Sequence, residues 1–148
     1  MPTDPYLTNL LKGDSFYAQK TPVTGRLTVI LRGHLDDRGL ELIPQRSRVV
    51  TVGEVHELLI VDDPHAGPGR TVSRIAALGF VEFTSGGVLL VGDRVSVREE
   101  VIGHLVGYDM THMPNHMNIV IGDVRARSGE ELGLELSAVV TFAMPHDA

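Results

Sequence analysis

The chain consists largely of short segments in which apolar and polar residues alternate, separated by turns that contain glycine. Alternation with a period of two is typical of β-strands that are buried on one face. Segments of this kind cover residues 24–33, 53–61, 74–83, 101–109, 116–123 and 134–142, and residues 87–97 form a further pair around a Gly-Asp turn. The pattern predicts seven or eight strands and therefore an all-β protein.

Seven or eight short strands can form either a barrel or a sandwich. Gly103 and Gly107 lie inside one strand segment and indicate strong coiling or close backbone approach, which favours a small antiparallel β-barrel. Asp4 is a suitable N-cap and Pro5 suits the first helical position, so a short helix is expected over residues 4–13. The length of 148 residues fits a single domain over residues 1–148.

Composition excludes several classes of function. The chain has no cysteine, which rules out disulfides, thiolate nucleophiles and cysteine-ligated metal centres. A net charge of −6 without a basic run makes nucleic acid an unfavourable partner. No apolar stretch approaches the roughly 20 residues that span a bilayer, and the first residues lack the features of a signal peptide. We therefore expect a cytoplasmic protein with no membrane partner.

The stretch YDMTHMPNHMN, residues 108–118, has the highest density of groups that can bind or react. If residues 101–108 and 116–121 form a hairpin in a symmetric register, Tyr108 lies opposite His116, and these two share one face with His104 and Asn118. The opposite face is small or apolar. This arrangement predicts a small-molecule pocket in the barrel lumen.

Three chemistries fit this stretch. The first is cofactor-free acid–base catalysis by an isomerase, lyase or cyclase, in which histidine transfers protons near neutral pH and tyrosine donates to a developing oxyanion. The sequence contains no Walker-type loop and no dinucleotide-binding glycine motif, so no cofactor is predicted. The residues expected to act are His116, Tyr108 and His104 as catalytic groups and Asn118, His112, Glu54 and His56 as substrate-binding groups.

The second chemistry is a divalent transition-metal site formed by Asp109, His112 and His116. On a helix the His-x3-His spacing would be a strong ligand pair, but Pro114 makes a helix unfavourable here and removes the geometric meaning of the spacing. The third is a non-catalytic module that binds a small ligand. Two further alternatives stay open: the segment GEVHEL, residues 53–58, could be an exposed edge strand, and edge strands in so small a sheet favour a homodimer.

Several segments resemble an uncharacterised bacterial family of unknown function. The pattern combines Gly-Phe-x-Glu-Phe, Gly-Gly-Val and Gly-Asp with a His-x-Pro-Asn-His-x-Asn-Ile segment, which here is HMPNHMNI, residues 112–119. The likeness covers residues 24–122. It implies a shared fold and draws attention to His112, Pro114, Asn115, His116 and Asn118, but it implies no activity.

Overall fold

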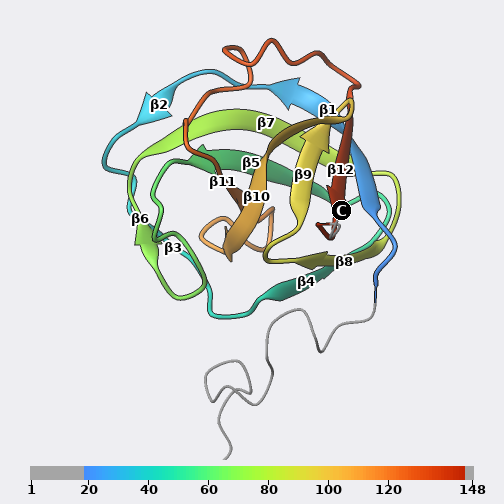
Figure 1. The fold of residues 1–148 in the computed structure, drawn as a ribbon, viewed down its shortest axis with the longest axis horizontal. Coiled ribbons are helices and arrows are strands. Elements are labelled where there is room, and N and C mark those ends of the chain that lie inside the picture. The colour runs from blue at the N-terminus through green and yellow to red at the C-terminus, as the bar shows by residue number, and fades with distance from the viewer. Residues whose placement is uncertain (1–18, 146–148) are drawn as a thin grey trace, which may run out of the picture.

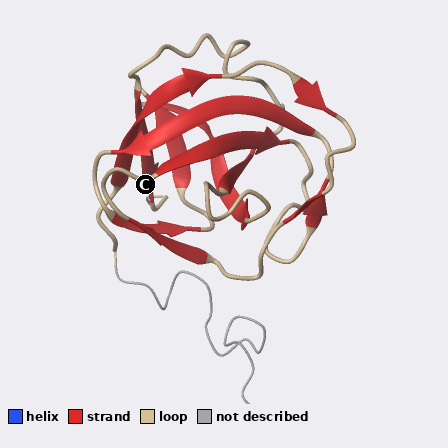
Figure 2. Cartoon of the chain, turned by 180° about the vertical axis from the view of Figure 1, so that it is seen from behind, coloured by secondary structure: helices blue, strands red, loops and turns tan. Residues whose placement is uncertain are grey.

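The computed structural model describes residues 19–145, which contain strands, turns and loops (Figures 1 and 2). The expected helix over residues 4–13 lies outside the described residues. The strands are β1 (Val23–Ile30), β2 (His34–Leu35), β3 (Leu40–Glu41), β4 (Ser47–Val50), β5 (Val55–Val61), β6 (Thr71–Val72), β7 (Ile75–Phe83), β8 (Gly87–Leu90), β9 (Arg94–Val97), β10 (Glu100–Asp109), β11 (Asn118–Gly122) and β12 (Val139–Ala143). The prediction of an all-β protein is confirmed.

Seven of these strands form a closed ring of hydrogen-bonded neighbours. The order is β1-β12-β9-β10-β11-β5-β7, and the pairing of β7 with β1 completes the circuit (Figure 1). β2 pairs with the first residues of β7, while β3 pairs with β6 and β4 with β8 as separate two-stranded sheets. Every strand of the ring has a neighbour on both sides, so the edge-strand argument for a homodimer does not extend to the ring.

The expectation of a purely antiparallel sheet is wrong at one pairing. β5 and β11 run parallel, with Glu57 opposite Asn118 and Val61 opposite Gly122. A parallel pair needs a long connection, and here β6 to β10 lie between the two strands in the chain. β5 therefore lies between β11 and β7, and the segment GEVHEL does not lead into an exposed edge strand.

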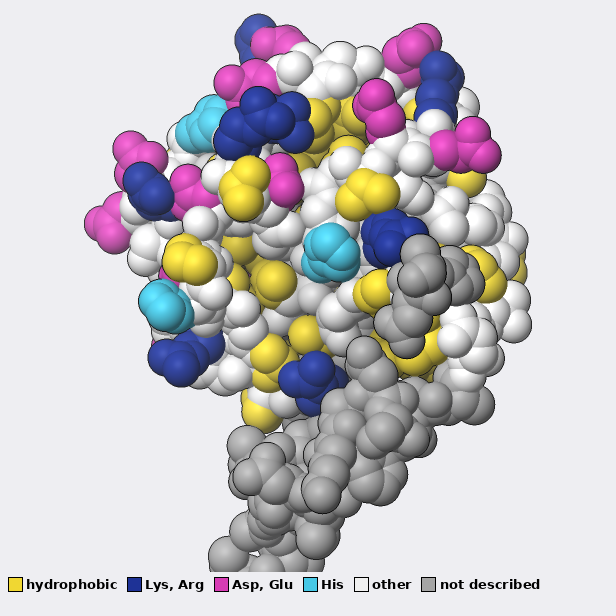
Figure 3. All heavy atoms as spheres, viewed as in Figure 1, with side chains coloured by type: hydrophobic (Ala, Val, Ile, Leu, Met, Phe, Trp, Pro, Cys, Tyr) yellow, Lys and Arg dark blue, Asp and Glu magenta, His cyan; other side chains and the backbone are white. Residues whose placement is uncertain are grey.

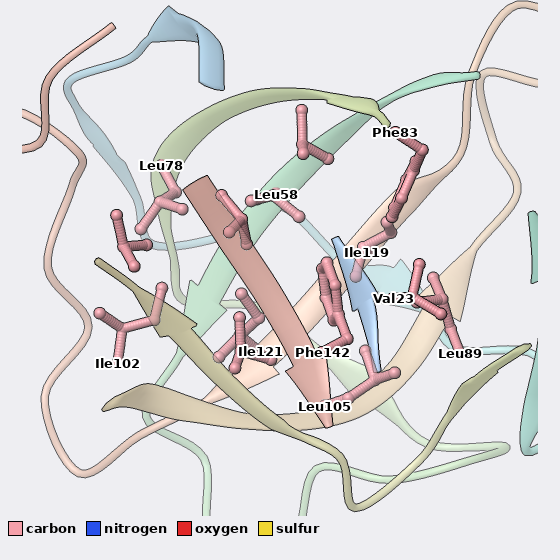
Figure 4. Close-up of a cluster of buried hydrophobic side chains, with 14 of the residues drawn as sticks. Val23, Leu58, Leu78, Phe83, Leu89, Ile102, Leu105, Ile119, Ile121 and Phe142 are labelled. Atoms are coloured by element: carbon pink, nitrogen blue, oxygen red, sulfur yellow. The ribbon is translucent and has the colours of Figure 1, made fainter. Parts of the chain in front are cut away.

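A hydrophobic core fills the inside of the ring. Its largest fully buried side chains include Tyr108, Phe83 and Phe142, and Figure 4 shows Phe83 and Phe142 among aliphatic side chains from several strands. A second, smaller cluster lies on the outer face of the ring beneath β3 and β6 and contains Leu40, Leu42, Leu59, Val61, Val72, Ile75 and Val120. Alternate residues of β5 and β11 thus enter different cores, as the period of two requires.

Two expectations about individual strands differ in outcome: the close backbone approach inside β10 is confirmed, and the single strand over residues 134–142 is wrong. Gly103 has φ +152°, and a Cβ at this position would meet the carbonyl oxygen of Gly122, so the expected close backbone approach is confirmed. The alternation over residues 134–142 does not form one strand, because Ser137 is left-handed with φ +68° and β12 begins only at Val139. Leu136 is consequently 62% exposed rather than buried with the rest of its predicted face.

No helix in the described part of the chain is long and apolar enough to cross a membrane.

Candidate functional site

A row of four residues crosses the outer face of the ring where β10 ends and β11 begins. Asp109 on β10 lies opposite Asn118 on β11, Asn118 lies opposite Glu57 on β5, and Glu57 lies opposite Phe80 on β7. Asn118 precedes Val120 of the outer cluster by two residues, so its side chain is on the outer face. The loop over residues 110–117 adjoins one end of this row and supplies the two histidines of the site.

The loop brings His112 and His116 together. The backbone N–H of His116 donates to the carbonyl of His112 at 3.3 Å, which closes a single turn, and the two imidazole rings stack with their centroids 5.0 Å apart. Residues 111–115 form turns rather than a helix, as Pro114 predicts, and one isolated turn is enough to place both rings side by side. His116 also packs edge-to-face against Phe80 at 5.2 Å.

His116 and Glu57 bring an imidazole and a carboxylate close together beside the loop. His116 Nδ1 lies 2.7 Å from Asn115 Oδ1, to which it donates its proton. The other ring nitrogen, Nε2, lies 3.5 Å from Glu57 Oε1. This separation suits an ion pair, but Nε2 is buried and has no partner in hydrogen-bond geometry.

Asp109 holds the start of the loop and orients Asn118. Its Oδ1 accepts hydrogen bonds from the Thr111 backbone N–H at 3.0 Å and from Asn118 Nδ2 at 3.1 Å, and its Oδ2 accepts from the Thr111 hydroxyl at 3.0 Å. Because a carboxylate only accepts, Asn118 must point its amide nitrogen toward Asp109 and its oxygen the other way. Asn118 Oδ1 is buried and has no hydrogen-bond partner.

The metal alternative requires Asp109, His112 and His116 to converge. Asp109 instead uses both oxygens within the loop and toward Asn118, as described above. Among residues 19–145 no group of three or more histidine and acidic side chains is arranged to hold a metal ion.

A pocket of about 270 Å³ opens beside this row on the outer face. Glu57, His112 and Asn118 provide its polar wall, and the apolar floor comes from the outer face of β5 and β7. Residues of β2 and the segments on either side of it form the remaining wall; they are Arg32, Gly33, His34, Leu35 and Arg38. Figure 3 shows one face of the molecule, on which histidine side chains lie beside lysine or arginine side chains. A concave apolar surface with a few convergent polar groups is the usual form of a small-molecule site.

His56 lies on the opposite side of the sheet from the pocket but supports the loop. Its Nε2 lies 2.8 Å from Glu54 Oε1, and its Nδ1 accepts the backbone N–H of Met117 at 3.0 Å. Nδ1 must be unprotonated to accept, so Nε2 carries the hydrogen and donates it to Glu54. Burial lowers the pKa of His56 below its ordinary value, although Glu54 raises it, and the imidazole is therefore neutral around neutral pH.

Glu54 completes this support as an anion. Burial raises the pKa of Glu54, but the hydrogen bonds from His56 and Thr51 and the charge of Arg48 together hold it below its ordinary value. Arg48 Nη2 lies 3.3 Å from Glu54 Oε1. Glu54 and His56 thus lie together as a pair, and in the structure they position Met117 rather than line the pocket.

The predicted common face of four residues is wrong. Tyr108 lies opposite Ile119 rather than His116, three positions from the expected register. A bulge between Leu105 and Gly107 contributes one of these positions, and this single-residue shift puts Tyr108 on the opposite face from Asn118. Tyr108 is fully buried in the inner core, whereas Asn118 faces outward. Burial, with the charge of Asp93, raises the pKa of Tyr108 far above its ordinary value, and its hydroxyl reaches only the carbonyl of Arg46 at 3.4 Å.

His104 is exposed and lines a different depression on the surface. Of the seven residues expected from sequence, the structure brings His112, His116 and Asn118 together, pairs Glu54 with His56 elsewhere, and separates Tyr108 and His104 from both groups. The lumen of the ring is filled by the hydrophobic core, and the pocket lies outside it.

Sequence reasoning missed Glu57, Phe80, Arg32 and Arg38. Glu57 left one signal, since it is a single carboxylate before a run of four apolar residues in β5. Phe80 and the two arginines left none, because only the pairing of distant strands places them near the loop.

Comparison with known proteins identifies the family to which the chain belongs. No match was found among curated proteins or among solved structures. Residues 17–143 match a family of unknown function, DUF6917, which agrees with the resemblance inferred from the HMPNHMNI segment and its neighbours. With most of its length matched, the chain belongs to the DUF6917 family.

Proposed function

We propose that this protein is a cofactor-independent enzyme of the lyase, isomerase or cyclase type, built on a small β-barrel and acting on a small carbonyl compound. The observation that carries the proposal is the pair formed by His116 Nε2 and Glu57 Oε1, 3.5 Å apart beside the pocket. Catalytic hydrogen bonds are often long in the absence of substrate, and an imidazole and a carboxylate pass a proton once they approach to about 3 Å.

The pocket suggests a role for each group. Glu57 lies on the wall and removes a proton from the carbon next to the substrate carbonyl, while His116 behind it takes up or returns that proton. The electron pair of the broken C–H bond forms the C=C bond of an enolate, and the carbonyl π pair moves onto the oxygen, where an N–H of His112 can donate a hydrogen bond. Return of the proton to another atom gives an isomer, and departure of a neighbouring group gives a lyase product. Tyr108 has no part in this scheme.

A non-catalytic ligand-binding module is the second candidate. It is favoured by the position of His116, which is stacked against His112 and does not itself form part of the pocket wall. In that case the pair would hold the wall of the pocket in place, and the protein would bind without turnover.

Hydrogen–deuterium exchange tests proton abstraction directly, whatever product the reaction forms. A panel of small 2-oxo acids, 3-oxo acids, aldehydes and ketones is incubated in D₂O with the protein, and loss of the proton next to the carbonyl is followed by NMR. We expect accelerated exchange for at least one compound, and Glu57→Gln or His116→Gln should reduce it by about a hundredfold or more.

The matched control is His104→Gln, which changes an exposed histidine outside the pocket. Its exchange rate should equal that of the unchanged protein. Saturable binding of a panel compound without any exchange would favour the binding module. Exchange that survives both Glu57→Gln and His116→Gln would reject the assignment of the pair.

A further inference from the structure

Two arginines form part of the pocket wall in a protein that is acidic overall. Arg32 and Arg38 lie on either side of β2 and line the same wall of the pocket. The net charge of the chain is −6. Arg32 is 3.9 Å from Glu130 with both side chains largely exposed, which is a weak, solvent-screened pair. Among the described residues no carboxylate forms an ion pair with Arg38. The pocket therefore has a cationic end that is offset only by the weak, exposed pair of Arg32 with Glu130.

The polar wall of the pocket carries acceptor oxygens and therefore needs a hydrogen-bond donor, whereas the arginines need an anion. Asn118 is only 2% exposed, and its unpartnered Oδ1 can satisfy its hydrogen-bonding capacity only with a donor. Asp109 prevents the amide from turning over, as its carboxylate must receive Asn118 Nδ2. Glu57 adds a second acceptor on the same wall. A buried acceptor without a donor costs about 1–3 kcal/mol, so a ligand that supplies an O–H or N–H here gains affinity.

The floor and the size limit what lies between these ends. Leu59, Ile75 and Ala77 form an apolar surface suited to a short hydrocarbon segment. A volume of about 270 Å³ corresponds to about nine water molecules at roughly 30 Å³ each. The pocket therefore accommodates a molecule of roughly ten non-hydrogen atoms.

We infer that the ligand is a small organic carboxylate that also carries a hydroxyl or amino hydrogen, with its carboxylate held by Arg32 and Arg38 and its hydrogen directed at Asn118 Oδ1. A guanidinium binds a carboxylate through paired, charge-assisted hydrogen bonds, which explains why arginine rather than lysine would serve at this wall. This inference rests on the proposed function, because it names the substrate class of the same pocket.

Binding of three matched compounds tests both ends separately. Butyrate has the carboxylate alone, 1,4-butanediol has the hydroxyl alone, and 4-hydroxybutyrate has both. Titrations of the isotopically labelled full chain are followed by NMR, with shifts expected at Asn118 and its neighbours. We expect 4-hydroxybutyrate to bind most tightly and butanediol most weakly.

Two variants assign the preference to the named residues. Arg38→Gln should weaken both carboxylates by about tenfold, equivalent to roughly 1.4 kcal/mol, and leave butanediol unchanged. Asn118→Leu should remove the advantage of 4-hydroxybutyrate over butyrate. Arg125→Gln is the matched control, because Arg125 is exposed and lies outside the pocket.

The inference is overturned if the carboxylates bind no more tightly than butanediol, or if Arg38→Gln behaves like Arg125→Gln. Inorganic phosphate binding in preference to all three compounds would also overturn it, by replacing the carboxylate with another anion. Failure here is separable from failure of the proposed function. Proton exchange on neutral carbonyl compounds alone would keep the enzyme and reject the carboxylate, whereas carboxylate binding without exchange on any panel compound would do the reverse.

Discussion

Acidification below pH 6.5 is expected to destabilise the fold through His56. In the unfolded chain this histidine takes up a proton around its ordinary pKa of 6.5, whereas burial lowers the pKa in the folded protein. Between the two values the unfolded state binds more protons than the folded state, so the free energy of unfolding falls as the pH falls. The contribution is complete above pH 6.5 and declines below it.

The geometry explains why the folded protein resists protonation. A proton on Nδ1 would occupy the lone pair that accepts the Met117 N–H at 3.0 Å, and His56 is only 4% exposed, which leaves little access to water. One proton difference corresponds to a slope of at most about 1.4 kcal/mol per pH unit. Glu54 does not contribute to the pH dependence just below pH 6.5, because its pKa is held below 4.5 and its contribution to stability is lost only at lower pH.

The substitution His56→Asn separates titration from packing. The asparagine Oδ1 occupies a place similar to Nδ1 and can still accept the Met117 N–H, but it neither titrates nor reaches Glu54. We expect the free energy of unfolding at about pH 7.5 to fall by about 1–3 kcal/mol, from the lost bond to Glu54 and lost packing against Phe83.

Urea denaturation followed by circular dichroism, at several pH values from about 7.5 to 5, measures both effects. The pH slope of His56→Asn should be shallower than that of the unchanged protein by up to about 1.4 kcal/mol per pH unit. His104→Gln, a change to an exposed histidine, is the control and should keep the slope. Equal slopes for His56→Asn and the unchanged protein would refute the role given to His56.

Two further predictions concern the ring and its core. Gly79→Ala should lower the free energy of unfolding by about 2–4 kcal/mol in the same assay, because a Cβ there would collide with the Val29 carbonyl oxygen where β1 pairs with β7. Gly67→Ala is the control and should change the free energy of unfolding little, because a Cβ at Gly67 would face open space. Tyr108→Phe should lower the free energy of unfolding by less than about 1 kcal/mol and leave the rate of proton exchange unchanged, because the hydroxyl makes a long hydrogen bond to a backbone carbonyl. A large loss of proton exchange in this variant would show that Tyr108 does act in the site.

Much of the fold could be predicted because strand signals are local. The segments around β1, β5, β7, β10 and β11 are predicted within a few residues of their observed bounds, since alternation and glycine turns act over neighbouring residues. The same local reasoning selects His112, His116 and Asn118 as candidate residues, and the structure places them close together. It fails at residues 134–136, where the alternating pattern continues but the backbone turns at Ser137.

The sequence by itself therefore determined which segments form the strands of the ring and which loop carries the histidines, although it did not indicate β2, β3, β4 or β6. Only the tertiary structure decided what those groups meet. One bulge in β10 moved Tyr108 into the inner core, and the parallel pairing of β11 with β5 brought Glu57 to His116 from a distant part of the chain. Register and strand order depend on contacts between distant segments and on a period of two, so a shift of one residue exchanges the inner and outer faces while leaving the local pattern unchanged.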